Sequence, residues 1–358
     1  MRGEREQRQA AGQRRASEAP AAGDGVDDRP ARAWWLALPL VPVLAIFAAC
    51  LWNARGWVGR PFPGFLIAEN GIVVSIGLAE WAHARYRSLP FARVLAVDGR
   101  PVSGGRDVHA YVETLGVGKP IIYTFRQGTD IFRLPLRVRP FGRADFLELF
   151  VPLLGVGLLM VLVSATVVAL RPHAAEARAL FAVCLAIGLI LITGADAYWP
   201  YWFTPVFYLS LCAIPPASLQ LALTYPQRRG FARGRPVLWG LVYLPFVALA
   251  CALIVTMPDA SLFLPLLYTV YFLMANGVLL NVGALVSGLI DGLEPRRPVA
   301  LALAAVLGSS LLAAAIVVSY PLLQRPISPA GVFGPLLLLP VLEGIAFVRF
   351  PRPRIPAR

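Results

Sequence analysis

The sequence predicts an α-helical polytopic membrane protein of about eight transmembrane helices, with one small α+β domain inserted after the first helix. The 358 residues are 58% hydrophobic and 15% charged, and the mean hydropathy is +0.66. Soluble domains are about 25% charged. The apolar residues lie in blocks of about 20, the length that crosses roughly 30 Å of hydrocarbon. Most of the basic residues lie in short segments beside these blocks, as membrane topology requires.

The chain begins with a polar segment and then a first apolar block. Residues 1–32 are rich in Arg, Gln, Ala, Gly and Asp and show no apolar period. This composition indicates a disordered cytoplasmic tail. The tail is too long and too acidic for the basic region of a signal peptide. We therefore expect residues 33–52 to form a retained transmembrane helix.

Seven further apolar blocks follow between residues 146 and 349, and each is long enough to span a bilayer. Their approximate bounds are 146–170, 178–198, 202–224, 236–257, 262–290, 298–320 and 331–349. The block at 262–290 is longer than a bilayer requires, so we expect it to tilt or to extend past the membrane. Residues 350–358 then form a short cytoplasmic tail.

The distribution of Lys and Arg predicts the orientation. With a cytoplasmic N-terminus, the inner segments hold 19 of the 33 basic residues, the outer loops hold only Arg325, and residues 53–145 hold the other 13. Inner loops of membrane proteins carry the excess of basic residues, and long domains follow this rule weakly. The count predicts that both termini are cytoplasmic and that the inserted domain lies outside.

The inserted segment, residues 57–143, has the pattern of short strands and one helix. Strands are expected at 65–68, 71–76, 93–97, 120–125 and 130–138. The pair Asp98-Gly99 between apolar runs indicates a hairpin turn. Val108, Val112 and Leu115 have the spacing of one helix face, which predicts a helix from residue 107 to 115.

This segment resembles a bacterial PDZ domain in residues 93–102, in the helix near 107 and in the strand 121–126. Pro63, Gly64, Phe65 and Leu66 resemble the carboxylate-binding loop of that family. The resemblance implies that this loop, with Val108 and Val112 of the helix, binds a peptide that adds a strand to the sheet edge. The Gly-Asp pair common in the family is missing from residues 79–92. A domain that only packs on the membrane helices is the alternative.

The order of parts resembles the membrane input region of bacterial sensor proteins, chiefly histidine kinases. The carriers outside the inserted domain are Leu170-Arg171-Pro172, Ala177-Arg178-Ala179, residues 221–226 and residues 344–349. The resemblance implies the bacterial inner membrane and a kinase-type output partner in the cytoplasm. Residues 350–358 are too few to fold as an output domain, so that partner is either a separate chain or a domain absent from this sequence.

Motifs for chemistry are not found. An intramembrane zinc protease needs His-Glu-x-x-His on one helix, but His83, His109 and His173 are scattered outside the apolar blocks. All four cysteines lie inside apolar blocks, without metal or disulfide spacing. No glycine loop for phosphates follows a strand. We therefore expect no enzyme activity, no metal, no cofactor and no nucleic-acid partner.

Polar residues within the apolar blocks are the default candidates for function. They are Glu343, Asp196, Asn276 and Asn281. Glu343 lies close to Arg349, which favours an interpretation in which it reaches the cytoplasmic interface or pairs with a basic group. The aromatic residues from Tyr198 to Trp202 favour an interfacial belt over a ligand pocket.

Together these features favour a membrane-embedded sensor or signal-input protein. Its PDZ-like domain would bind a peptide or protein segment outside the membrane and would act on a cytoplasmic partner. The alternative is a transporter or channel with a structural PDZ-like domain. The scarcity of charged groups in the apolar blocks is the feature against it.

Overall fold

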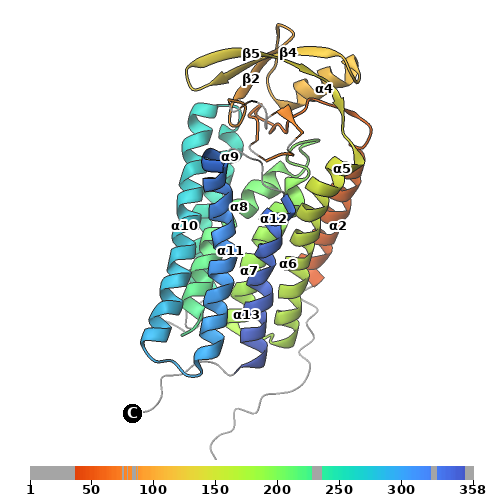
Figure 1. Ribbon diagram of the computed structural model, residues 1–358. Coiled ribbons are helices and arrows are strands. Elements are labelled where there is room, and N and C mark those ends of the chain that lie inside the picture. The colour runs from red at the N-terminus through yellow and green to blue at the C-terminus, as the bar shows by residue number, and fades with distance from the viewer. Residues whose placement is uncertain are drawn as a thin grey trace, which may run out of the picture. The chain divides into compact units, whose positions relative to one another are not determined.

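The computed structural model describes residues 37–350, with gaps at residues 75, 79, 83–85, 87, 228–235 and 324–328. The expected N-terminal tail, residues 351–358 of the expected C-terminal tail, His83 and the basic residues at 228–235 and 325 lie outside the described residues. Figure 1 shows a small sheet with one helix at one end of a bundle of long helices.

Each predicted apolar block falls on a helix or on a continuous helical run. The long helices are α2 (Ala37–Arg55), α6 (Val151–Leu170), α7 (Ala175–Gly194), α8 (Thr204–Thr224), α9 (Pro236–Thr256), α10 (Ala260–Ile290), α11 (Arg296–Leu323) and α13 (Leu338–Arg349). Seven helices within the described residues are long and apolar enough to cross a membrane, as a polytopic helical membrane protein requires. The remaining expected block, 298–320, falls on α11, and the number eight stays a prediction.

Short helical segments extend two of these spans. The second span begins with α5 (Arg143–Asp145) and a π-helical stretch, η2 (Phe146–Phe150), before α6. The last span begins with α12 (Pro329–Phe333) and a 3-10 turn, η4 (Gly334–Leu337), before α13. Helix α10 has 31 residues, so it is longer than the hydrocarbon thickness requires, as the sequence predicts.

Helices α6, α7 and α8 pack in sequence, and α10 packs on α8. Small residues allow the closest approach. A Cβ atom at Gly157 of α6 would lie 2.8 Å from the carbonyl oxygen of Gly188 of α7, so only glycine fits there. Asn281 of α10 donates from Nδ2 to the carbonyl oxygen of Ser218 on α8 at 2.9 Å. Interhelical hydrogen bonds of this kind join membrane helices.

Residues 57–142 form the part that we call the sheet domain. Its antiparallel sheet has the order β3-β2-β4-β5, from β2 (Arg93–Val97), β3 (Arg100–Pro101), β4 (Pro120–Gln127) and β5 (Asp130–Arg137). Ile121, Tyr123 and Phe125 alternate along β4 and are fully buried, which is the period-two pattern of a strand with one buried face. Helix α4 (Gly105–Leu115) contributes Val108 and Val112 to the same core. Among the described residues, the strands expected at 65–68 and 71–76 form only isolated bridges, Ile67 with Val73 and Ile72 with Arg93.

The two chain connections between the sheet domain and the bundle run side by side. Strand β1 (Pro61–Phe62) follows α2 and pairs with β6 (Arg139–Pro140), which precedes α5. The pairing extends through Gly59, whose N–H donates to the carbonyl oxygen of Phe141 at 2.8 Å. Entry and exit of the domain are therefore joined by backbone hydrogen bonds.

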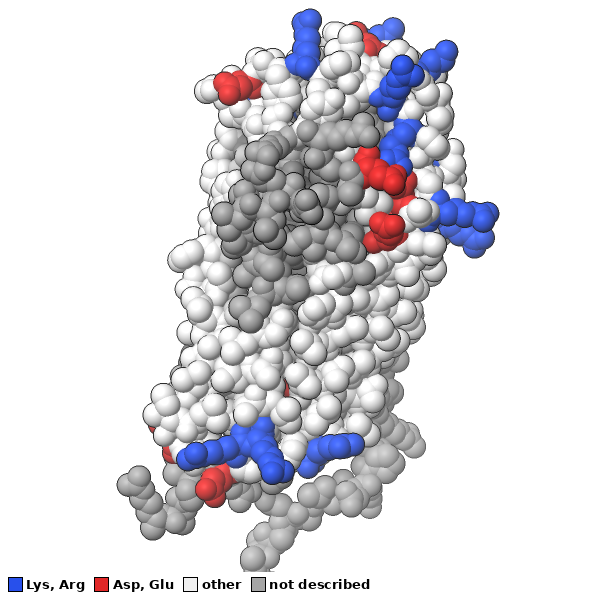
Figure 2. Space-filling view, viewed as in Figure 1, with Lys and Arg blue, Asp and Glu red and all other residues white. Residues whose placement is uncertain are grey.

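The charged residues are separated along the molecule. On the face drawn in Figure 2, Lys and Arg gather at the two ends, and the broad band between them consists almost entirely of uncharged residues. Many large apolar side chains of the long helices are exposed, among them Leu241, Val255 and Phe272. An exposed apolar surface of this extent fits contact with lipid.

Candidate functional site

The site begins with the segment 65–68, which has one paired edge and one open edge. Ala68 donates its N–H to the carbonyl oxygen of Ile72 at 2.9 Å, and Leu66 accepts from the N–H of Val74 at 3.0 Å. Alternate residues of an extended segment direct their backbone groups to opposite edges. The carbonyl group of Ile67 therefore faces the open edge, away from residues 72–74.

Tyr201 covers this open edge. It comes from the loop between α7 and α8, and its hydroxyl donates to the carbonyl oxygen of Ile67 at 3.0 Å. The same side chain lies against the first turn of α4, because the guanidinium of Arg106 stands 5.3 Å from the centre of its ring. A Cβ atom at Gly105 would lie 2.1 Å from the Tyr201 hydroxyl oxygen, so the absence of a side chain at Gly105 makes room for it. Tyr201 thus lies between the segment 65–68 and α4.

Asp196 organises the loop that presents Tyr201. Its side chain is fully buried and accepts hydrogen bonds from Asn53 Nδ2 of α2 at 3.1 Å and from the N–H of Phe203 at 2.7 Å. Its carbonyl oxygen accepts from the N–H of Trp199 and of Tyr201, both at 3.1 Å. Burial raises the pKa of Asp196, and the bonds from Phe203 and Asn53 oppose that shift. Asp196 therefore ties the loop to the first transmembrane helix.

The loop also contacts α4 one turn further along, at His109. The ring centre of Trp199 lies 4.9 Å from that of His109, and the backbone of Tyr198 hydrogen-bonds to the imidazole. Burial lowers the pKa of His109 to about 4, and the bond to Tyr198 opposes the shift. His109 is therefore neutral at neutral pH.

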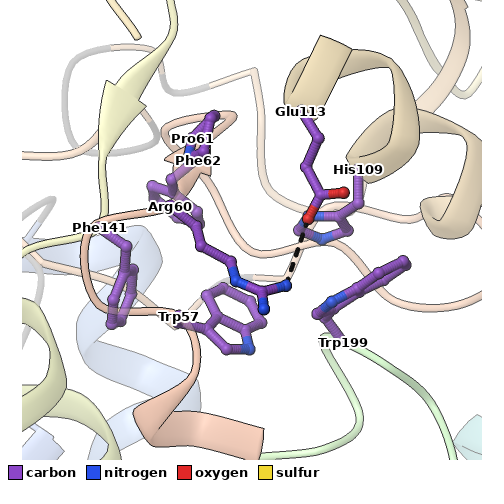
Figure 3. Close-up of a pocket in the computed structure, with 8 residues that line it drawn as sticks. All are labelled: Trp57, Arg60, Pro61, Phe62, His109, Glu113, Phe141 and Trp199. Carbon is purple, nitrogen blue, oxygen red and sulfur yellow. Dashed lines mark ion pairs between the residues drawn. The ribbon is translucent and has the colours of Figure 1, made fainter. Parts of the chain in front are cut away.

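A small pocket lies beside this contact, and Figure 3 shows the side chains around it. Its volume is about 20 Å³, which is room for about one water molecule. The lining residues are Trp57, Arg60, Pro61, Phe62, His109, Glu113, Phe141 and Trp199. Within the described part of the chain, Trp57 Nε1 and His109 Nε2 are buried without hydrogen-bond partners. The pocket thus offers one donor and one acceptor to a very small polar group.

Two of the lining residues form an ion pair. Arg60 approaches Glu113 of α4 with 3.6 Å between Nη1 and Oε1. The two side chains are 61% and 42% exposed, and exposed pairs of this kind contribute at most about 1 kcal/mol. The pair is therefore part of the pocket lining and contributes little to the stability of the fold.

A second anchor joins the sheet domain to the start of the second span. Asp145 of α5 is 4% exposed and accepts from Trp81 Nε1 at 3.0 Å and from the N–H of Gly142 at 2.7 Å. Arg139 adds an ion pair at 3.2 Å. These bonds fix the direction in which the chain enters the membrane helix.

We call the contacts of the loop residues Asp196, Trp199 and Tyr201 with α2 and the sheet domain the junction. The residues predicted for peptide binding lie beside this junction, and their side chains are in the domain core. Phe65, Val108 and Val112 are fully buried and belong to one apolar cluster, and Leu66 is 1% exposed. Pro63 is also buried. Gly64 has a φ angle of 90°, and its carbonyl oxygen accepts from the N–H of Ala82 at 2.9 Å.

The intramembrane polar candidates are not brought together. Asn276 and Asn281 donate to backbone carbonyl groups, of Phe272 at 2.7 Å and of Ser218 and Gly277 at 2.9 Å, so both have structural partners. Asp196 belongs to the junction described above. Glu343 is 2% exposed, and no ion pair to it is formed by the described residues. The interpretation that Glu343 reaches the interface or pairs with a basic group is therefore wrong for this part of the chain.

The belt interpretation of the aromatic cluster is also wrong for most of its residues. Tyr198 and Tyr201 are buried, at 8% and 3% exposure, and only Trp202 is largely exposed, at 62%. The sequence does not predict that Tyr201 and Trp199 contact the sheet domain. The closely spaced aromatic residues from Tyr198 to Trp202 indicate a contact site, but their partners Ile67 and His109 lie far away in the sequence.

Comparisons with protein-family models, with curated proteins and with solved structures found no match to this chain. The function must therefore be inferred from the geometry of the site itself. Within the described residues, no group of three or more His, Cys, Asp or Glu side chains is placed to hold a metal ion.

Proposed function

We propose that this protein is a membrane-embedded signal-input protein whose sheet domain is PDZ-like and binds a peptide or protein segment. The segment would add as a strand to the open edge of residues 65–68. The proposal rests chiefly on one observation, the hydrogen bond from Tyr201 to the carbonyl group of Ile67 at that edge.

The bond links peptide binding to the transmembrane helices. A peptide strand needs the carbonyl group of Ile67 as a hydrogen-bond acceptor. Tyr201 must leave before the peptide can bind there. Tyr201 belongs to the loop between α7 and α8, which Asp196 joins to α2 through Asn53. Displacement of the loop would therefore shift the outer ends of α2, α7 and α8. A cytoplasmic partner would respond to the changed packing of these helices.

The proposed orientation puts the sheet domain outside the membrane and the ends of α6 and α13 in the cytoplasm. The excess of arginine at the predicted inner loops supports it. A cysteine replacing Thr129 in the turn between β4 and β5 should react in intact cells with a membrane-impermeant maleimide. A cysteine replacing His173 should react only after permeabilisation. The opposite pattern would overturn the orientation.

The peptide-binding step can be tested with the full chain in lipid nanodiscs. The probe is a displayed library of random peptides with free carboxyl termini. Tyr201→Ala should bind selected peptides about 10- to 30-fold more tightly than the wild type, because a self-occupied edge reduces the apparent affinity by its free fraction. Tyr111→Phe, which removes a solvent-side hydrogen bond to Asp98 in the same domain, is the matched control. Failure to select any peptide on Tyr201→Ala would refute peptide binding.

The signalling step needs a second readout. Spin labels at His173→Cys and Asp291→Cys, in a background without the native cysteines, would report the distance between two cytoplasmic turns by pulsed electron resonance. Binding of a selected peptide should change this distance distribution, and Tyr201→Ala should shift it without peptide. If a selected peptide binds and the distance distribution between the two spin labels stays unchanged, the signal-input function is refuted.

Transport is the second candidate, and the observation that favours it is the buried carboxyl group of Glu343 in the bundle. Ionisable groups inside membrane domains mark ion pathways in many proteins. A flux assay in proteoliposomes would separate the two functions, because signal input predicts no flux.

A further inference from the structure

Glu343 is a carboxyl group without a compensating charge inside the helix bundle. It lies on α13, is 2% exposed, and its Oε2 atom has no hydrogen-bond partner among the described residues. The nearby basic residue Arg171 is engaged elsewhere, because its Nη2 donates to the carbonyl oxygen of Val348 at 2.9 Å. Nothing in the described bundle therefore neutralises a carboxylate at this position.

The neighbours of Glu343 on α6 and α7 are apolar or weakly polar. A Cβ atom at the next residue, Gly344, would lie 2.8 Å from Val167 Cγ2 of α6, which shows how closely the two helices pack. The Cys184 thiol of α7 lies near Glu343 and hydrogen-bonds to Ser164 of α6. These neighbours supply a hydroxyl and a thiol, but no charge.

The facing part of α11 is also without charge. A Cβ atom at Gly308 would lie 2.9 Å from Leu338 at the start of α13, and α11 enters this bundle from Arg296 at the end where α13 finishes. Ala302 and Ala305, which precede Gly308 on α11, are fully buried. The part of α11 between Arg297 and Gly308, which packs in the same bundle as α13, therefore carries no charged residue.

We infer that Glu343 is a proton-binding site and that it is a neutral carboxylic acid in this arrangement of the bundle. An unpaired carboxylate buried among apolar side chains costs several kcal/mol, and such a group keeps its proton instead. Loss of the proton would leave an uncompensated charge between α6, α7 and α13. Proton occupancy is therefore coupled to the packing of α13. This inference rests on the bundle alone and does not depend on peptide binding or on signal input.

The reaction of dicyclohexylcarbodiimide with a protonated carboxyl group in an apolar site tests this inference. The acid adds across one C=N bond, its proton goes to nitrogen and its oxygen to carbon, and the acyl group then migrates to nitrogen. The stable N-acylurea contains the whole reagent, so the peptide gains the full reagent mass. The full chain in nanodiscs should carry this adduct at Glu343. Glu343→Gln should lose it, whereas Glu148→Gln, at an exposed carboxyl of the second span, should keep it.

Thermal unfolding of the same variants gives an independent readout. Glu343→Gln should keep the wild-type Tm, because a neutral amide replaces a neutral acid of nearly the same shape. A Tm clearly below that of the wild type would indicate a lost ionic interaction and would overturn the inference. Absence of the adduct at Glu343 in the wild type would overturn it as well, whether or not Glu343→Gln folds.

Discussion

Replacing Tyr201 by Phe removes one hydroxyl group from the contact between the loop and the sheet domain. The hydroxyl is buried and donates to the carbonyl oxygen of Ile67 at 3.0 Å. Burial raises the pKa of Tyr201, so the hydroxyl stays protonated and remains a donor. A neutral hydrogen bond contributes about 0.5–1.5 kcal/mol, and an acceptor left buried without a partner costs about 1–3 kcal/mol. We therefore expect the loop contact to weaken by about 1–2 kcal/mol, roughly a 5- to 30-fold change in its opening equilibrium.

Hydrogen exchange measured by mass spectrometry in nanodiscs reads this equilibrium directly. The amide groups of Trp199, Tyr201 and Phe203 are bonded to Asp196, so peptides that cover residues 197–204 should exchange faster by the same factor. Tyr111→Phe removes a hydroxyl that bonds to Asp98 at 3.1 Å on the solvent side and should leave this segment unchanged. Equal exchange in Tyr201→Phe and wild type would refute the proposed role of the contact.

Three further predictions concern the same junction. Asp196→Ala removes the acceptor of two side-chain hydrogen bonds, and the free energy of unfolding in detergent should fall by roughly 2–4 kcal/mol; a value equal to wild type would contradict this. The pKa of His109 is about 4 in the folded chain and 6.5 without burial, so the unfolded chain binds more protons between these values. Stability should be complete above pH 6.5 and should fall by roughly 3 kcal/mol as the pH drops to 4, and His109→Gln should flatten this profile. Gly105→Ala would place Cβ 2.1 Å from the Tyr201 hydroxyl and 2.7 Å from the Ala68 carbonyl oxygen. This overpacking should lower the free energy of unfolding by about 1–3 kcal/mol and should speed hydrogen exchange in residues 197–204. Hydrogen exchange equal to that of the wild type in this segment would argue against so close an approach.

Local patterns in the sequence predict most of the helices and strands. The apolar blocks predict the long helices within a few residues, because a bilayer demands about 20 apolar residues for each crossing. The run from residue 120 to 125, which is followed by Gln127-Gly128, predicts β4, and the spacing of Val108, Val112 and Leu115 predicts α4. These features depend on neighbours within one element, so a single sequence reveals them.

The junction depends on contacts that no local pattern encodes. Tyr201 and Ile67 are 134 residues apart, and Asn53 and Asp196 are 143 residues apart. An aromatic run at the end of a span fits a lipid interface as well as a protein contact, so the sequence favoured the belt. The sequence does not predict the environment of Glu343 for a similar reason, because its neighbours on α6 and α7 depend on how three helices pack.

The pairing of β1 with β6 has a mechanical consequence. Because the two strands are bonded to each other, the two covalent links of the sheet domain act as a single hinge, about which the domain could rock. The bond from Tyr201 to Ile67 lies away from that hinge in the sequence, as do the contact of Trp199 with His109 and the bond from Arg93 Nη2 to the carbonyl oxygen of Pro258 at 3.3 Å. Because several contacts besides the hinge hold the domain, its tilt relative to the helices would change only when these contacts loosen together, while the paired strands keep it attached.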